Sequence, residues 1–140
     1  MKNSSATVSA ELGLRLVVPD HGSVPLVASL SYSAEDPFAI RMAFHVGTDE
    51  PVEWIFARDL LAVGMEGAAG EGDVQVWPAD EHGHELLNIA LSSPFGEAHF
   101  EAPRSSLGAF LSRTYEVIAP GHETDYIDVD SELDELLWRA

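Results

Sequence analysis

Apolar and polar residues alternate along most of the first half of the chain. Between residues 8 and 18, apolar side chains such as Leu12 and Leu14 share one side, and most of the polar ones share the other. Side chains of a β-strand point alternately to its two faces, so this pattern predicts a half-buried strand. The alternation returns over 24–32 after turn-forming residues at 19–22, and we therefore expect the two segments to form a hairpin.

Two more strands and a short helix are expected next. The segment 38–46 places Phe38, Ile40, Met42, Phe44 and Val46 on one face. The segment 52–56 does the same with Val52, Trp54 and Phe56. Four strands in succession predict an antiparallel meander. Residues 58–65 lose the two-residue period and carry good helix formers ahead of Gly64 and Gly67, which predicts a short helix.

The second half repeats this order of elements. The glycine-rich stretch 64–72 predicts a flexible connection. Further strands are expected at 74–78, 85–91 and 97–102. A second helix is expected to open at Ser105 and Ser106 and to end before Pro120. Its apolar residues at helical spacing are Leu107, Phe110, Leu111 and Ile118. The order strands, helix, strands, helix indicates an α+β fold.

The acidic C-terminal segment, residues 121–140, differs from the rest of the chain. Its carboxylates are Glu123, Asp125, Asp128, Asp130, Glu132, Asp134 and Glu135. Apolar residues lie among and after them, at Leu133, Leu136, Leu137 and Trp138. A capping-box pattern at 131–134 makes a short terminal helix plausible. Three interpretations stay open, namely packing on the same domain, docking to another subunit or partner, and disorder. These four apolar residues are our candidate interface residues.

Composition limits the class of protein. The chain has 140 residues and no cysteine, which predicts a single domain spanning residues 1–140 and excludes disulfides, thiolate metal sites and cysteine nucleophiles. No stretch approaches the ~18 consecutive apolar residues of a membrane span, and the N-terminus lacks a signal-peptide core. We therefore expect a soluble, cytoplasmic protein that does not insert directly into a membrane.

The charge balance disfavours nucleic acid as a partner. Acidic residues number 24 and basic residues 7, for a net charge of −17. Affinity for nucleic acid depends largely on lysine and arginine displacing counterions from phosphates. The aromatic residues that could stack on bases fall on apolar faces and are assigned to the core. They are Trp54, Phe56, Trp77, Phe100 and Phe110.

No motif predicts catalysis. The run 80–85 contains two histidines and three carboxylates, all of them metal-ligand types, at Asp80, Glu81, His82, His84 and Glu85. We interpret it as a solvated hairpin loop rather than a metal site, because metal sites usually need a further ligand from a distant, rigid element. The glycine-rich stretch 67–72 lacks the Lys-Ser/Thr pair of a phosphate loop. No nucleophile elbow or triad signature is present in the sequence. We expect a protein that is not an enzyme and uses no cofactor.

Six stretches, taken together, resemble the SsgA-like proteins of sporulating actinobacteria. They are 11–18 (ELGLRLVV), 52–61 (VEWIFARDLL), 72–78 (GDVQVWP), 91–98 (LSSPFGEA), 109–115 (AFLSRTY) and 128–133 (DVDSEL). Each stretch alone is a weak signal, and their combination in this order is specific. The resemblance spans nearly the whole chain.

The resemblance carries expectations of its own. It implies a cytoplasmic, non-enzymatic regulator of sporulation-specific cell division that marks septum sites with an SsgA-type partner, recruits the tubulin-like protein FtsZ and promotes its polymerisation. It also implies a fold similar to that of the whirly single-strand nucleic-acid-binding proteins, with two antiparallel β-sheets and helices, assembled as a homotrimer. The alternative function is a whirly-type single-stranded nucleic-acid-binding regulator, which the net charge of −17 disfavours.

Overall fold

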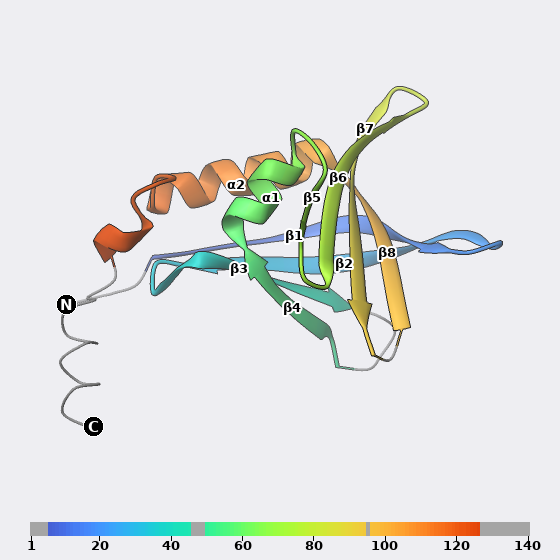
Figure 1. Ribbon diagram of the computed structural model, residues 1–140, viewed down its shortest axis with the longest axis horizontal. Coiled ribbons are helices and arrows are strands. Elements are labelled where there is room, and N and C mark those ends of the chain that lie inside the picture. The colour runs from blue at the N-terminus through green and yellow to red at the C-terminus, as the bar shows by residue number, and fades with distance from the viewer. Residues whose placement is uncertain (1–5, 46–49, 95, 127–140) are drawn as a thin grey trace.

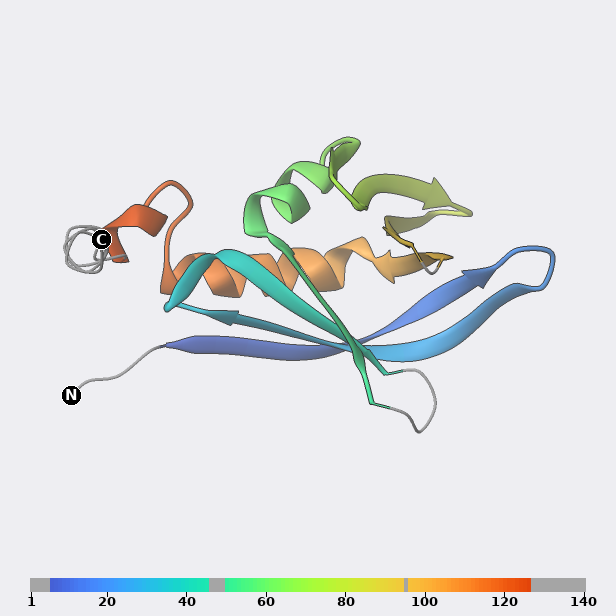
Figure 2. The same ribbon diagram turned by 60° about the horizontal axis from the view of Figure 1, so that its bottom comes forward.

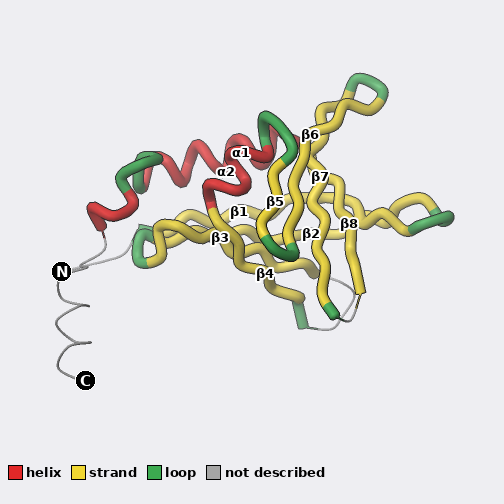
Figure 3. Tube along the Cα trace, viewed as in Figure 1, coloured by secondary structure: helices red, strands yellow, loops and turns green. Residues whose placement is uncertain are grey.

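Eight antiparallel strands form one curled sheet with two helices packed against it (Figure 1). The computed structural model describes residues 6–45, 50–94 and 96–126. The elements are β1 (Thr7–Val18), β2 (Gly22–Ser33), β3 (Asp36–His45), β4 (Val52–Ala57), α1 (Arg58–Gly64), β5 (Ala69–Glu71), β6 (Val74–Glu81), β7 (His84–Ser93), β8 (Gly96–Pro103), α2 (Arg104–Val117) and the 3₁₀ turn η1 (Glu123–Tyr126). Figure 3 shows how much of the chain the strands occupy. The α+β class is confirmed.

The first four strands form the predicted meander. β1 and β2 pair along their whole length, from Thr7 opposite Ser33 to Val18 opposite Gly22. The turn between them places Asp20 in the left-handed region, at φ 67°. One face of these strands is buried and the other faces outward, as the alternation predicted.

The outcome at Phe38 differs from the prediction. Phe38 is exposed, whereas Ile40, Met42 and Phe44 are buried as expected. The pairing of β2 with β3 shifts register between Ser31 and Ser33, so the strict two-residue alternation breaks at the start of β3. The sequence pattern alone contains no signal for this shift.

The second half contains a strand that we assigned to a flexible connection. Residues 69–71 form β5, which pairs with the start of β6, from Ala69 opposite Val76 to Glu71 opposite Val74. Gly72, at φ 61°, supplies the left-handed conformation that the tight turn to β6 requires. A strand of three residues is too short to show a hydrophobic period. The prediction of a flexible connection over 64–72 was therefore wrong in part.

The two meanders belong to a single sheet, and the expectation of two sheets was wrong. The strand order is β4-β3-β2-β1-β8-β7-β6-β5, and β1 meets β8 at two residue pairs, Arg15 opposite Glu101 and Leu16 opposite Phe100. This short seam joins what would otherwise be two exposed sheet edges. The rings of Phe44 on β3 and Phe100 on β8 stack between the two meanders, with centroids 4.1 Å apart. The comparison of Figures 1 and 2 shows how strongly the sheet curls.

Both helices lie at the positions that the sequence predicts. α2 packs on β1, β7 and β8. Its residues Leu107, Phe110 and Leu111 are buried. Figure 2 shows the helix lying along the sheet. α1 contacts β3, β4, β5 and β6. Ile118, which we placed on the apolar face of the second helix, instead follows its end in an extended conformation and is still buried.

The close approach of α1 to β6 generates a test of this packing. A Cβ atom added at Gly64 would lie 2.7 Å from Cβ of Val76, whereas one added at Gly67 meets nothing within 4 Å. We expect Gly64→Ala to lower the free energy of unfolding by about 1–3 kcal/mol, the range for overpacked cores, despite the higher helix propensity of alanine. Urea unfolding measures the change, with Gly67→Ala as the control. Equal stability of the two variants would contradict the packing described here.

Candidate interaction site

Arg58, the first residue of α1, is a buried cation at the centre of the helical side of the molecule. Its side chain is only 2% exposed. Nη1 donates hydrogen bonds to the carbonyl oxygens of Ile118, at 2.8 Å, and Thr114, at 3.3 Å. The Thr114 carbonyl lies in the last turn of α2 and also accepts from the Ile118 N–H at 3.0 Å, while the Ile118 carbonyl follows the end of the helix, where backbone acceptors lack helical partners. The last turn of α2 contains no basic residue of its own, so Arg58 supplies the missing cation from another element.

The acidic partner of Arg58 comes from the C-terminal segment. Nη2 of Arg58 donates a hydrogen bond to Oε2 of Glu123 at 2.8 Å, and the Glu123 side chain is 16% exposed. The other carboxylate oxygen of Glu123 accepts from the backbone N–H of Gly121 at 3.0 Å. The hydrogen bond from Arg58 holds the pKa of Glu123 below its usual value. The first acidic residue of this segment is thus fixed to the body of the protein.

Two tyrosine rings complete the surroundings of the guanidinium. Its central carbon lies 4.8 Å from the ring centroid of Tyr32 and 5.0 Å from that of Tyr115. The hydroxyl of Tyr32 donates to the carbonyl oxygen of Pro37 at 2.9 Å, and burial raises the pKa of this tyrosine. Arg58 therefore links β2, α1, α2 and η1 through hydrogen bonds, one ion pair and two cation–π contacts.

This cluster was not predicted as a site. Arg58 and the pair Thr114–Tyr115 lie within stretches that carry the family resemblance, and Glu123 belongs to the acidic run. Their separation along the chain, 56 to 65 residues from Arg58, hides the contacts from any local pattern. The only local hint is the place of Arg58, between an apolar strand and a helix, where its side chain can be buried. A buried arginine is rarely unpaired, so this position points to a partner elsewhere in the chain.

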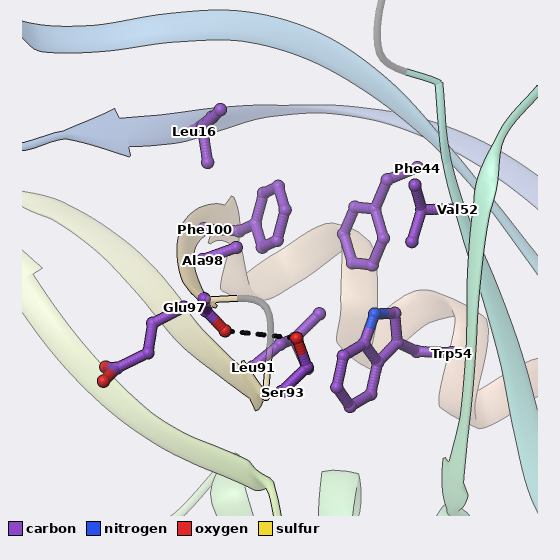
Figure 4. A pocket seen from close by; sticks show the side chains of 10 residues that line it. Leu16, Phe44, Val52, Trp54, Leu91, Ser93, Glu97, Ala98 and Phe100 are labelled. Carbon is purple, nitrogen blue, oxygen red and sulfur yellow. Dashed lines mark hydrogen bonds between the residues drawn. The ribbon is translucent and has the colours of Figure 1, made fainter. Parts of the chain in front are cut away.

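A second feature is an apolar cavity of about 310 Å³ near the seam (Figure 4). Phe44 and Phe100 lie side by side at the cavity, and Val52 and Trp54 line it from β4. The end of the β7–β8 hairpin forms the facing wall, where Oγ of Ser93 donates to the carbonyl oxygen of Gly96 at 3.3 Å. Five strands from both meanders thus contribute to one cavity.

The predicted candidate residues have different outcomes. Leu133, Leu136, Leu137 and Trp138 lie outside the described residues, so their role as an interface stays a prediction. Residues 80–85 form the tip of the β6–β7 hairpin, as expected, with His82 and Gly83 in the turn. In the part of the chain that the structure describes, no group of three or more metal-ligand side chains could hold a metal ion.

The aromatic residues assigned to the core are found there in part. Phe56, Phe100 and Phe110 are buried. Trp54 packs partly buried against the core, and the Trp77 ring lies 5.4 Å from that of His99 on the outer face of the second meander. Across residues 6–45, 50–94 and 96–126, no helix is long and apolar enough to cross a membrane.

Together these features define a class of protein, a β-rich α+β domain with one curled sheet, a buried Arg58–Glu123 pair and an open apolar cavity. Comparison with known proteins places the chain more closely. Residues 26–123 match the family described as "Streptomyces sporulation and cell division protein, SsgA". The chain belongs to this family, whose members are non-enzymatic cell division proteins.

Individual relatives are similar over nearly the whole chain. The sporulation-specific cell division protein SsgB of Thermobifida fusca is 56% identical over 98% of this chain and 99% of its own. The SsgB protein of Streptomyces coelicolor is 50% identical over 95% of this chain and 97% of its own. A crystal structure of the SsgA-like sporulation-specific cell division protein from Thermobifida fusca superimposes with a TM-score of 0.87 at 56% identity, over 96% of this chain and 98% of that one.

The Arg58–Glu123 pair predicts a defined dependence of stability on pH. A carboxyl with a lowered pKa in the folded state stabilises the fold above its unfolded pKa, near 4.3, and this contribution is lost as the pH falls through the folded value. We expect Glu123→Gln to lower the free energy of unfolding by about 2 kcal/mol at pH 7, the scale of a hydrogen bond between charged groups. The difference from wild type should shrink as the pH falls below about 4.

Urea unfolding across this pH range is the measurement. Asp125→Asn is the control, since Asp125 meets His122 at 3.0 Å on an exposed surface and should change stability by less than about 0.5 kcal/mol. A difference between Glu123→Gln and wild type that stays constant with pH would contradict the assignment of the charge pair.

Proposed function

We propose that this protein regulates sporulation-specific cell division by binding other division proteins in the cytoplasm at the septum. In this proposal it marks the septum site together with an SsgA-type partner, recruits FtsZ and promotes FtsZ polymerisation. The observation that carries the proposal is the 56% identity, over 98% of the chain, to a protein named as a sporulation-specific cell division protein. The finer steps rest on the family resemblance.

The acidic C-terminal segment is the proposed contact region. Glu123, the first acidic residue of this segment, is held to the body of the protein by its ion pair with Arg58. Leu133, Leu136, Leu137 and Trp138 are the residues we propose for the interface, because apolar and aromatic side chains provide most of the binding energy at protein interfaces. The surrounding carboxylates would chiefly set the association rate and its dependence on salt. We also propose that the protein acts as a homotrimer.

The alternative of a whirly-type nucleic-acid-binding regulator has less support. The net charge of −17 opposes contact with phosphates, and three of the aromatic side chains that could have stacked on bases are buried. A partner that carries basic or apolar surface fits this chain better than a polyanion does.

Co-sedimentation with FtsZ filaments tests the proposed function. We expect wild-type protein to pellet with FtsZ and to increase the polymerised fraction. The double variant Leu137→Ala with Trp138→Ala should pellet at least about tenfold less well, since loss of a buried aromatic anchor often costs ~2 kcal/mol or more. Circular dichroism melting and light scattering on both proteins control for the fold and for the expected mass of three chains.

The outcomes separate the two parts of the proposal. Wild-type protein that stays in the supernatant at low and moderate salt would contradict FtsZ recruitment. Equal pelleting of wild type and double variant would leave recruitment intact and refute the role of the C-terminal residues.

A further inference from the structure

One edge of the sheet is left unpaired beside the apolar cavity. β4 pairs with β3 on one side, and within the described residues no strand pairs with its other side. The opposite edge of the sheet, β5, is only three residues long and contacts α1. Unpaired N–H and C=O groups along a strand edge are a template for another extended segment. β4 is therefore the available edge for strand addition.

The side chains of β4 make this edge unusually apolar. Val52 is 52% exposed and Ile55 is 50% exposed, at opposite faces of the strand. The one acidic side chain between them, Glu53, is engaged with Arg41 of β3 at 3.6 Å. Natural edge strands are commonly protected by charged side chains. Here the carboxylate of Glu53 is paired with Arg41 of the neighbouring strand.

The cavity lies directly against this edge. Val52 and Trp54 of β4 form one of its walls, and the stacked pair Phe44 and Phe100 lies alongside (Figure 4). Its volume, about 310 Å³, is roughly twice that of the engineered apolar cavity of about 150 Å³ that binds benzene. It is at the lower limit of the range of about 300–1,000 Å³ for drug-sized ligands. Its size thus fits one large apolar side chain, or two small ones, better than a whole cofactor.

Charge indicates the chemistry of the segment that would enter. Glu97 is the one charged residue among the described residues that line the cavity, and its side chain points away from Phe44 and Trp54 (Figure 4). No cation lines the cavity there, and the chain as a whole carries a net charge of −17. A segment with lysine or arginine beside its apolar anchor complements this negative charge. The chain's own terminal residues Leu136 and Leu137 follow Asp134 and Glu135, so like charges oppose their docking here.

We propose that an extended segment of a partner protein binds here, pairing with the free edge of β4 and inserting an apolar side chain into the cavity, with a lysine or arginine next to that apolar side chain in the segment. Such strand addition draws affinity from main-chain hydrogen bonds and specificity from the pocket that receives alternate side chains. The proposal rests on the proposed function only in requiring a protein partner. It assigns a second contact surface, separate from the C-terminal segment.

A random-peptide phage library selected on the full-length protein provides the test, independently of FtsZ. We expect enriched peptides with alternating apolar residues and a neighbouring lysine or arginine. Val52→Lys should weaken binding of a synthetic version of such a peptide by about tenfold or more, because it places a cation at an apolar wall and repels the basic residue. Val63→Lys is the matched control, since Val63 is 51% exposed on α1, against 52% for Val52.

Two further measurements test the edge and the charge. Amide hydrogen exchange along Val52–Ala57 should slow on binding, because the free edge becomes hydrogen-bonded. Binding should weaken as the salt concentration rises, because a basic segment is attracted by the net charge of −17.

Several results would overturn the proposal. These are peptides that bind Val52→Lys and wild type equally, enriched sequences without basic residues, and unchanged exchange in β4. Competition by a synthetic peptide of residues 127–140 would identify the chain's own segment as the occupant. A fall to monomer mass on Val52→Lys would identify a second copy. Failure of FtsZ to co-sediment bears on the proposed function alone and leaves this selection unaffected.

Discussion

The buried guanidinium of Arg58 is the constraint on which the arrangement of the helices and the C-terminal segment depends. A charge removed from water is stable only when it is paired and its donors are satisfied, and the penalty for leaving it unpaired is several kcal/mol. Here the end of α2, the carboxylate of Glu123 and the rings of Tyr32 and Tyr115 together meet this requirement. Displacement of any one of these elements would remove part of the pairing of a buried cation. The cluster therefore selects one relative position for four elements that are distant in sequence.

The sheet has a comparable point of dependence at the seam between its two meanders. Only Arg15 and Leu16 of β1 pair with β8, and the rings of Phe44 on β3 and Phe100 on β8 stack between the two meanders. The sheet is strongly curled (Figure 2), and in the described part of the chain β4 has no strand on its outer edge. Residues from five strands of both meanders line the apolar cavity beside that edge. The edge and the cavity together are the contact surface that we propose for a partner.

The sequence alone predicted the local elements well and the long-range contacts poorly. The alternation in 8–18 and 24–32, and its loss at 58–65, identified strands and a helix because each depends on neighbouring residues. The single sheet was missed because the β1–β8 seam involves two residue pairs with no signature of their own. The cavity was missed for a similar reason, since five strands contribute to it. The Arg58–Glu123 pair joins residues 65 apart, and Glu123 was hidden within a run of acids expected to be solvated.

The most direct test of the central role of Arg58 is amide hydrogen exchange on the Arg58→Met variant. The control is Arg113→Met, which removes an arginine of α2. Arg113 donates one hydrogen bond to the carbonyl oxygen of Ser9, at 3.1 Å, from an exposed position. We predict faster exchange at the C-terminal end of α2 and in η1 for Arg58→Met and not for Arg113→Met. The exchange of buried strand amides, such as that of Ile89, should change only as much as the global free energy of unfolding changes. If the amides of Ile118 and Glu123 exchanged in Arg58→Met at the same rate as in the wild type, the account would be contradicted.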